Sequence, residues 1–91
     1  MLSFLPKTPH DIKESLRQRF KTRRKQLKLT QKELATKADV SLGSLKRFET
    51  TGQISLDSLL KLAFVLECLE DFDEVCEERE EMPESLEEVL K

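Results

Sequence analysis

Apolar residues recur every three or four positions along most of this chain, which is the spacing of amphipathic helices. Val, Ile and Thr are scattered, and no alternating run of four or more predicts a strand. Only two glycines and three prolines interrupt the pattern. The sequence therefore predicts an all-α fold.

The first helix is expected to begin after Thr8 and to run to about Leu27. Thr8 suits the N-cap, Pro9 the first helical position, and Asp11 the positive end of the helix. Its apolar face comprises Ile12, Leu16, Phe20 and Leu27. Its opposite face comprises Lys13, Arg17, Lys21 and Lys25. This face is basic, and by itself it is equally compatible with a solvated surface and with a contribution to a DNA-attracting field.

Two short helices follow, joined by a turn over residues 38–41. Thr30 and Glu33 form a capping box for the first of them, and Ser41 caps the second. We expect the second helix to end before Gly52, in the left-handed position that favours glycine. The residues expected to be buried are Leu34, Ala35, Ala38, Leu45 and Phe48.

A fourth helix is predicted after Ser55, and a weaker fifth helix follows it. The apolar stripe of the fourth is formed by Leu56, Leu59, Leu60, Ala63 and Phe64. Leu66 and Leu69 lead into the fifth, where Phe72, Val75 and Cys76 share one face. The four phenylalanines from Phe20 to Phe72 and both cysteines are interpreted as packing residues. Beyond Pro83, Leu86, Val89 and Leu90 are spaced for one more amphipathic turn in a Glu-rich segment, expected to be disordered without a partner.

The charge is divided sharply between the two ends of the chain. The 91 residues carry 16 basic and 18 acidic side chains, a net charge of −2. Residues 1–66 nevertheless carry a net +8, and residues 67–91 a net −10. This asymmetry is typical of a nucleic-acid-binding surface joined to an acidic tail. We expect an N-terminal arm over residues 1–8, one domain over residues 9–69, and an acidic tail or helix that contacts a partner over residues 70–91.

Several classes of protein are excluded by composition. No run of about 18 apolar residues predicts a membrane span, and Met1 to Pro6 is too short for a signal peptide. Two cysteines do not make a disulfide framework or a zinc site. With no nucleophile–base pair, metal cluster or phosphate loop, we expect a cytoplasmic protein without cofactor or metal that is not an enzyme.

The two short helices have the arrangement of a helix-turn-helix motif. A small residue, Ala35, stands where the second helix crosses the first. Val40 follows the turn and can lock the helices together, and Leu45 can anchor the second helix. Three matches at fixed spacing, with further amphipathic helices on both sides, predict this motif strongly.

Residues 24–49 resemble the Cro/CI (XRE-like) helix-turn-helix family. The resemblance is carried by Arg24, residues 29–35, residues 38–41, Leu45, Phe48, Glu49 and Gly52. It extends over roughly residues 12–69. It implies a five-helix domain of the lambda-repressor type that binds operator DNA as a dimer. The chain departs from the family at Lys28 and Asp39, where glycine is usual, although Asp tolerates the left-handed conformation better than most residues.

The resemblance also assigns roles to individual residues. Arg24 pairs with Glu49 at the end of the recognition helix, and Gln31 contacts a DNA phosphate. The outward recognition face comprises Ser41, Leu42, Gly43, Ser44, Lys46 and Arg47. Leu42 and Gly43 replace polar residues that often read bases in this family.

The residue types suggest how contacts with DNA divide between phosphates and bases. Phosphates are expected to meet the Thr30 hydroxyl, Gln31 and the backbone amides from Gln53 to Ser55, with added charge from Lys46 or Lys61. Arg47 is the best candidate for base readout because arginine binds guanine bidentately. A single copy offers too few contacts for tight specific binding, so we expect a homodimer on a palindromic operator.

A narrower resemblance concerns residues 41–49 and 51–63, which are similar to HipB-like antitoxins. It implies a protein that binds a HipA-like kinase toxin and represses its own operon. The surface expected to contact the dimer mate or partner comprises Leu66, Leu69, Phe72, Val75, Cys76, Leu86 and Leu90. Two alternatives remain open, a repressor without a toxin and an adaptor that no longer reads DNA. Three interpretations of the acidic tail remain open, a solubilising end, a partner-docking element and a competitor of DNA for the basic face of its own domain. The apolar residues Leu86, Val89 and Leu90 favour the partner-docking element over a purely solubilising end.

Overall fold

The computed structural model describes residues 6–78, and this part of the chain folds into five helices without a strand. The helices are α1 (Pro9–Gln26), α2 (Gln31–Ala38), α3 (Leu42–Thr51), α4 (Leu56–Val65) and α5 (Leu69–Asp73). The predicted all-α fold is confirmed. The predicted amphipathic turn at Leu86, Val89 and Leu90 lies outside the described residues.

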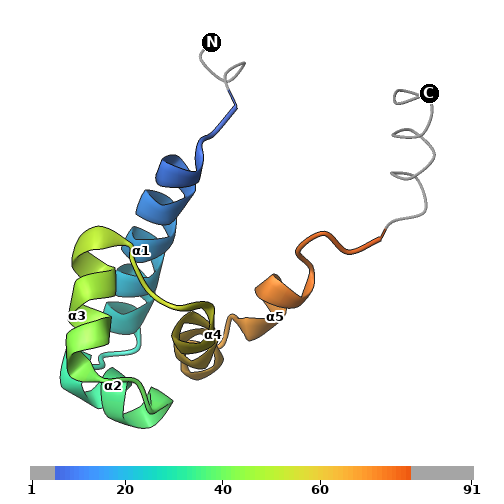
Figure 1. Ribbon diagram of the computed structural model, residues 1–91. Coiled ribbons are helices and arrows are strands. Elements are labelled where there is room, and N and C mark those ends of the chain that lie inside the picture. The colour runs from blue at the N-terminus through green and yellow to red at the C-terminus, as the bar shows by residue number, and fades with distance from the viewer. Residues whose placement is uncertain (1–5, 79–91) are drawn as a thin grey trace, which may run out of the picture.

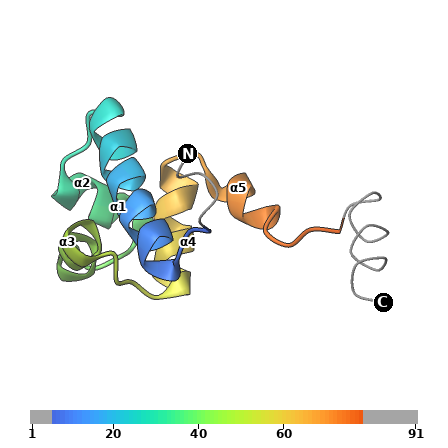
Figure 2. The same ribbon diagram turned by 90° about the horizontal axis from the view of Figure 1, so that it is seen from above.

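The helix-turn-helix pair α2 and α3 packs between the first and the fourth helix. α3 lies beside α1, and α2 contacts both α3 and α4 (Figure 1). α5 packs against α4. Both views place α5 on the side of the molecule away from α3 (Figures 1 and 2). No helix in the described region is long and apolar enough to cross a membrane.

The first four helices begin at the capping residues that the sequence predicts. The side-chain oxygens of Thr8, Thr30, Ser41 and Ser55 each accept a hydrogen bond from a backbone amide three residues later. Thr8 and Thr30 form complete capping boxes, with carboxylates that accept the cap residue's own amide. Each cap contributes about 1 kcal/mol to stability. These hydrogen bonds with Thr8 also lower the pKa of Asp11.

Several helix ends use the left-handed backbone conformation, and most of these positions are not glycine. Gly52 ends α3 at φ 82°, as predicted, and a Cβ atom there would lie 3.3 Å from the Lys13 Cβ. Lys28 and Asp39 adopt φ values of 60° and 58° after α1 and α2. The chain therefore keeps the backbone geometry of the glycines that these residues replace, at a steric cost of about 1–2 kcal/mol each in the general case.

The core forms where the helix-turn-helix meets α1 and α4. Phe20 lies edge-on to both Phe48 and Phe72, with ring centroids 5.5 and 6.3 Å apart. The buried apolar residues are Phe20, Leu34, Ala35, Ala38, Val40, Leu45, Phe48, Leu62, Ala63 and Leu66. The three residues predicted to lock the motif are all among them. The prediction of a helix-turn-helix packed on two flanking helices is confirmed.

The predicted apolar face of α1 is buried only at its centre. Phe20 is buried and Leu16 is partly buried, but Ile12 and Leu27 are 44% and 40% exposed. α3 meets this part of α1 through other residues, since Gly52 lies close to Lys13 and Arg17 Nη1 donates to the Glu49 carbonyl. Ile12 is left uncovered although α3 reaches its neighbour in the sequence, and Leu27 lies beyond the last residue of α1. The prediction was wrong for Ile12 and Leu27.

The predicted core face of α4 was also partly wrong. Leu56 and Phe64 are 66% and 70% exposed, whereas Leu62 is fully buried. α4 is apolar on nearly every side, so its packing against α2 decides which face is buried. Leu66 is fully buried and is not part of an exposed interface, and Cys76 is exposed rather than packed.

Candidate nucleic-acid interface

The outward surface of α3 presents the residues predicted to face DNA. Lys46 and Arg47 are exposed, while Leu45 and Phe48 on the opposite side are buried in the core. Ser41 is exposed at the N-cap, where its hydroxyl donates to the Ser44 hydroxyl at 2.8 Å and accepts the Ser44 amide at 3.1 Å. The core contacts thus fix α3 with its two basic side chains toward solvent.

The first turn of α3 offers little side-chain chemistry for reading bases. Leu42 is partly buried against the core, so only part of its surface is available to a base. Gly43 is exposed, and a Cβ atom added there would have no neighbour within 4 Å. Neither packing nor a positive φ requires glycine at this position. Its effect is to expose the backbone of the recognition helix.

A polar hollow of about 310 Å³ lies between α3 and the start of α4. It is lined by Ser44, Arg47, Gln53, Ile54, Ser55 and Ser58. The backbone amide of Gln53, which the sequence predicts to bind phosphate, donates to the Thr51 hydroxyl at 3.1 Å. The Ser58 amide donates to the Ser55 hydroxyl at the same distance. We therefore expect any anion in this hollow to meet the amides of Ile54 and Ser55 beside the Arg47 guanidinium.

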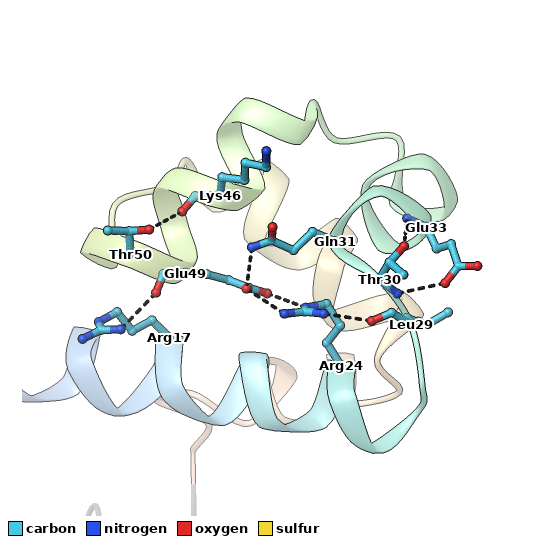
Figure 3. A network of polar contacts seen from close by, with 9 residues as sticks. All are labelled: Arg17, Arg24, Leu29, Thr30, Gln31, Glu33, Lys46, Glu49 and Thr50. Carbon is cyan, nitrogen blue, oxygen red and sulfur yellow. Dashed lines mark hydrogen bonds and ion pairs between the residues drawn. The ribbon is translucent and has the colours of Figure 1, made fainter.

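A buried polar network connects the recognition helix to α1 and α2 (Figure 3). The Glu49 carboxylate accepts hydrogen bonds from Arg24 Nε and Nη2, at 2.8 and 3.1 Å. Both side chains are buried, and Arg24 Nη1 also donates to the Leu29 carbonyl at 2.9 Å. The pair that the family resemblance implies is therefore a buried, bidentate ion pair that holds α3 against α1.

Gln31 joins the same network, a contact that the sequence analysis did not predict. Its Nε2 donates to Glu49 Oε1 at 2.9 Å (Figure 3). A carboxylate can only accept hydrogen bonds, so this contact fixes the Gln31 amide nitrogen toward Glu49. Gln31 is the first residue of α2 and is partly buried. The ion pair thus orients the side chain assigned to phosphate.

Other arginines of α1 stabilise the fold rather than face the recognition surface. Arg17 Nη1 donates to the Glu49 backbone carbonyl at 2.9 Å, and Arg17 Nη2 lies 2.7 Å from Glu14 Oε1. The hydrogen bond with Glu14 raises the pKa of Arg17, and the same contact lowers the pKa of Glu14. Arg23 Nη1 donates to the Leu66 carbonyl at 2.8 Å, at the end of α4. Sequence spacing identified Arg17 only as part of a basic face and did not single out Arg23.

The described residues contain no arrangement that suggests a metal centre. Across residues 6–78, no three His, Cys, Asp or Glu side chains cluster in a way that could hold an ion. Every buried side-chain nitrogen or oxygen in this range has a hydrogen-bond partner. Burial raises the pKa of the Cys68 thiol, which makes its reactive thiolate form less populated. The hydrogen bonds of the buried polar side chains in this range are therefore explained by their role in the fold.

The family assignment agrees with this geometry. The helix-turn-helix family HTH_3 matches residues 20–71, more than half of the chain, and the protein belongs to this family. It is a family of DNA-binding regulators of the Cro/CI type, with the lambda-repressor-like fold, and it is not an enzyme family. No curated protein and no solved structure matches the chain.

Proposed function

We propose that this DNA-binding regulator is a sequence-specific repressor that reads a palindromic operator as a homodimer. The observation that supports it is the exposure of Lys46 and Arg47 on α3, beside the polar hollow at the start of α4. In this proposal α3 enters the major groove and Arg47 donates to guanine O6 and N7. The exposed Gly43 lets the helix backbone approach the base edges closely, while Leu42 offers a small apolar contact to a thymine methyl.

Phosphate contacts on both sides of α3 would fix its depth and direction in the groove. On one side the donors are Gln31 and the Thr30 hydroxyl, at the start of α2. On the other side they are the backbone amides of Ile54 and Ser55, at the start of α4. Lys46 contributes its positive charge to the same face. Lys61 is a weaker candidate because its ammonium already lies 3.4 Å from the Asp57 carboxylate.

The proposed dimer forms through the apolar surface on the side of α4 and α5. Leu56, Phe64, Leu69 and Val75 are 66%, 70%, 36% and 66% exposed, which is unusual for so many large apolar side chains close together. A hollow of about 610 Å³ lies between α4 and α5, lined by five apolar residues with Glu70 and Asp73 at its edge. Pairing two such surfaces would place two copies of α3 on successive half-sites.

We further propose that the chain is the antitoxin of a HipA-like kinase toxin and represses the operon encoding both. Support for this finer assignment is the similarity of residues 41–49 and 51–63 to HipB-like antitoxins. A HipA-like kinase gene beside this one, and a stable complex when the two proteins are expressed together, are the expected findings. A neighbouring region without a kinase gene would favour the repressor without a toxin.

One observation favours the second candidate, an adaptor that has lost DNA readout. Leu42 and Gly43 leave the first turn of α3 without polar side chains other than serines. A repressor should bind its own upstream region far more tightly than unrelated DNA, whereas an adaptor should bind neither tightly. Competition gel shifts with both DNAs distinguish the two candidates.

Replacement of Arg47 tests the readout itself. Arg47→Ala should weaken operator binding by about 5- to 150-fold, the equivalent of about 1–3 kcal/mol, and should relax selectivity at one base pair. Lys25→Ala is a matched control, because it removes one exposed positive charge from α1. If Arg47→Ala retains the affinity and selectivity of the parent protein, the proposed base contact is wrong.

A further inference from the structure

An apolar groove is lined by residues of α1 and α5. α5 lies on the side of the molecule away from α3 (Figure 2). The volume of the groove is about 270 Å³. Its walls include Leu16 and Phe20 from α1, and Phe72 and Val75 from α5 and the residues that follow it. Phe20 contributes to the core, but Val75 is 66% exposed. The groove is therefore open on the side of α5.

The apolar surface continues from the groove along α1. Ile12 lies one helical turn before Leu16, on the same face, and is 44% exposed. A segment in the groove could extend over Ile12. It would then remove the apolar lining of the groove and the Ile12 side chain from water, which is favourable by about 25 cal/mol per Å² of apolar surface.

Positive charge borders this groove. Arg19 and Arg23 line it, and neither forms an ion pair with a carboxylate within residues 6–78. Asp71 is the acidic residue among the lining. α1 as a whole carries seven Lys or Arg and two acidic residues. The groove therefore suits a segment that is apolar on one face and acidic on the other.

We propose that residues 84–90 of this same chain occupy the groove. In this segment Leu86, Val89 and Leu90 have the i, i+3, i+4 spacing of one helical face, and Glu84, Glu87 and Glu88 supply the negative charge. Leu86 follows Val75 by eleven residues, and an extended chain of that length spans up to about 36 Å. Since Val75 itself lines the groove, the segment can reach every part of it.

The covalent connection favours this segment over the same segment of a second chain. A short flexible linker gives a tethered segment an effective concentration in about the millimolar range, which a separate molecule reaches only at very high protein concentration. α5, which forms one wall of the groove, lies away from α3 (Figures 1 and 2). The docked segment therefore leaves the recognition helix uncovered, and the inference does not rest on the proposed DNA binding.

Disulfide trapping in the full chain tests this proposal, because Cys68 lines the groove. The variant carries Cys76→Ser, which removes the other native thiol. It also carries Ser85→Cys, which introduces a thiol at a position next to the apolar residue Leu86 of the segment. In a glutathione redox buffer at mildly alkaline pH, most molecules should form the bond between positions 68 and 85. Mass spectrometry should find this bond within one chain, in a yield that dilution does not change.

Two controls separate docking from random encounter of the two thiols. Adding Leu86→Asp and Leu90→Asp to the same background should lower the trapped fraction several-fold, because it removes the apolar contact but keeps the linker. Arg19→Glu should also lower the fraction, whereas Lys25→Glu makes the same charge change outside the groove and should not. Equal trapping with and without the two leucines would overturn the proposal. A bond found only between two chains would also overturn it, and would assign the groove to a second copy.

Discussion

Glu49 at the end of the recognition helix and Arg24 on α1 form a bidentate ion pair, with both side chains almost removed from solvent. Arg24 Nε lies 2.8 Å from Glu49 Oε2, and the two residues are 7% and 4% exposed. Glu49 also accepts from Gln31 through its carboxylate and from Arg17 through its backbone carbonyl. One residue thus joins α1, α2 and α3, so the orientation of the recognition helix depends on it.

Removing one member of this pair should be strongly destabilising. Glu49→Ala leaves the Arg24 charge buried without its partner, so the free energy of unfolding should fall by about 3–5 kcal/mol. Urea denaturation followed by circular dichroism measures this loss. Lys61→Ala is the control, since it breaks an exposed ion pair with Asp57 and should have little effect. The double change Arg24→Met with Glu49→Leu should lose less than Glu49→Ala, because it leaves no unpaired charge, and a larger loss would contradict this explanation.

The contact between Glu49 and Gln31 leads to a prediction about DNA binding. Gln31→Ala should weaken binding to operator and unrelated DNA by a similar factor of about ten, since a phosphate contact carries no sequence information. The dependence on salt concentration should stay the same because Gln31 carries no charge. Lys46→Ala is the comparison, and should reduce the slope of log affinity against log salt by about one. A selective loss for operator DNA in Gln31→Ala would instead show that Gln31 reads a base.

Gly43 should show opposite effects on stability and on DNA binding. Alanine has a higher helix propensity, and the added Cβ meets no neighbour within 4 Å, so Gly43→Ala should stabilise the free domain by about 0.5–1 kcal/mol. The same methyl group should weaken operator binding if the helix backbone approaches DNA closely. Thermal denaturation and gel shifts measure the two effects, with Thr50→Ala as an exposed control on the same helix. Unchanged operator affinity in Gly43→Ala would refute the close approach.

Lys28 should be a site where glycine stabilises the protein. Lys28 ends α1 at φ 60°, a conformation that glycine adopts without steric cost. Lys28→Gly should therefore raise the free energy of unfolding by about 1 kcal/mol, which corresponds to about 4–8 °C in Tm for a domain of this size. Lys28→Ala removes the same charge but keeps the Cβ atom, and it should not raise Tm. An equal gain in both variants would attribute the effect to charge rather than to the backbone.

Local signals explain why the helix boundaries could be predicted. A capping hydroxyl such as that of Thr30 acts on amides three residues away, so its effect does not depend on the rest of the fold. The same is true of Gly52, whose left-handed conformation is a property of a single residue. The helix-turn-helix could also be predicted from the sequence, because Ala35, Val40 and Leu45 lock two helices that are adjacent in the sequence.

The candidate site was predictable only in part, since its residues come from separate segments. Spacing identified the outward residues of α3, such as Arg47, because the buried face of one helix defines the exposed one. It did not predict that the Gln31 side chain donates to the Glu49 carboxylate, or that the Thr51 hydroxyl accepts a hydrogen bond from the Gln53 backbone amide. The first contact depends on the distance between two segments, which helical periodicity does not contain. The second joins residues two positions apart in the turn after α3, where helical periodicity no longer applies.

The sequence by itself determined the five helices, the caps of the first four and the motif that α2 and α3 form, because these follow from local chemistry and the 3.6-residue period. Only the tertiary structure decided which apolar residues are buried. α4 is apolar on nearly all sides, and packing in the fold buries Leu62 while leaving Phe64 exposed. α3 reaches Lys13 and Arg17 on α1 but leaves the neighbouring Ile12 exposed. Burial depends on what lies opposite a side chain, and that is a property of packing rather than of pattern.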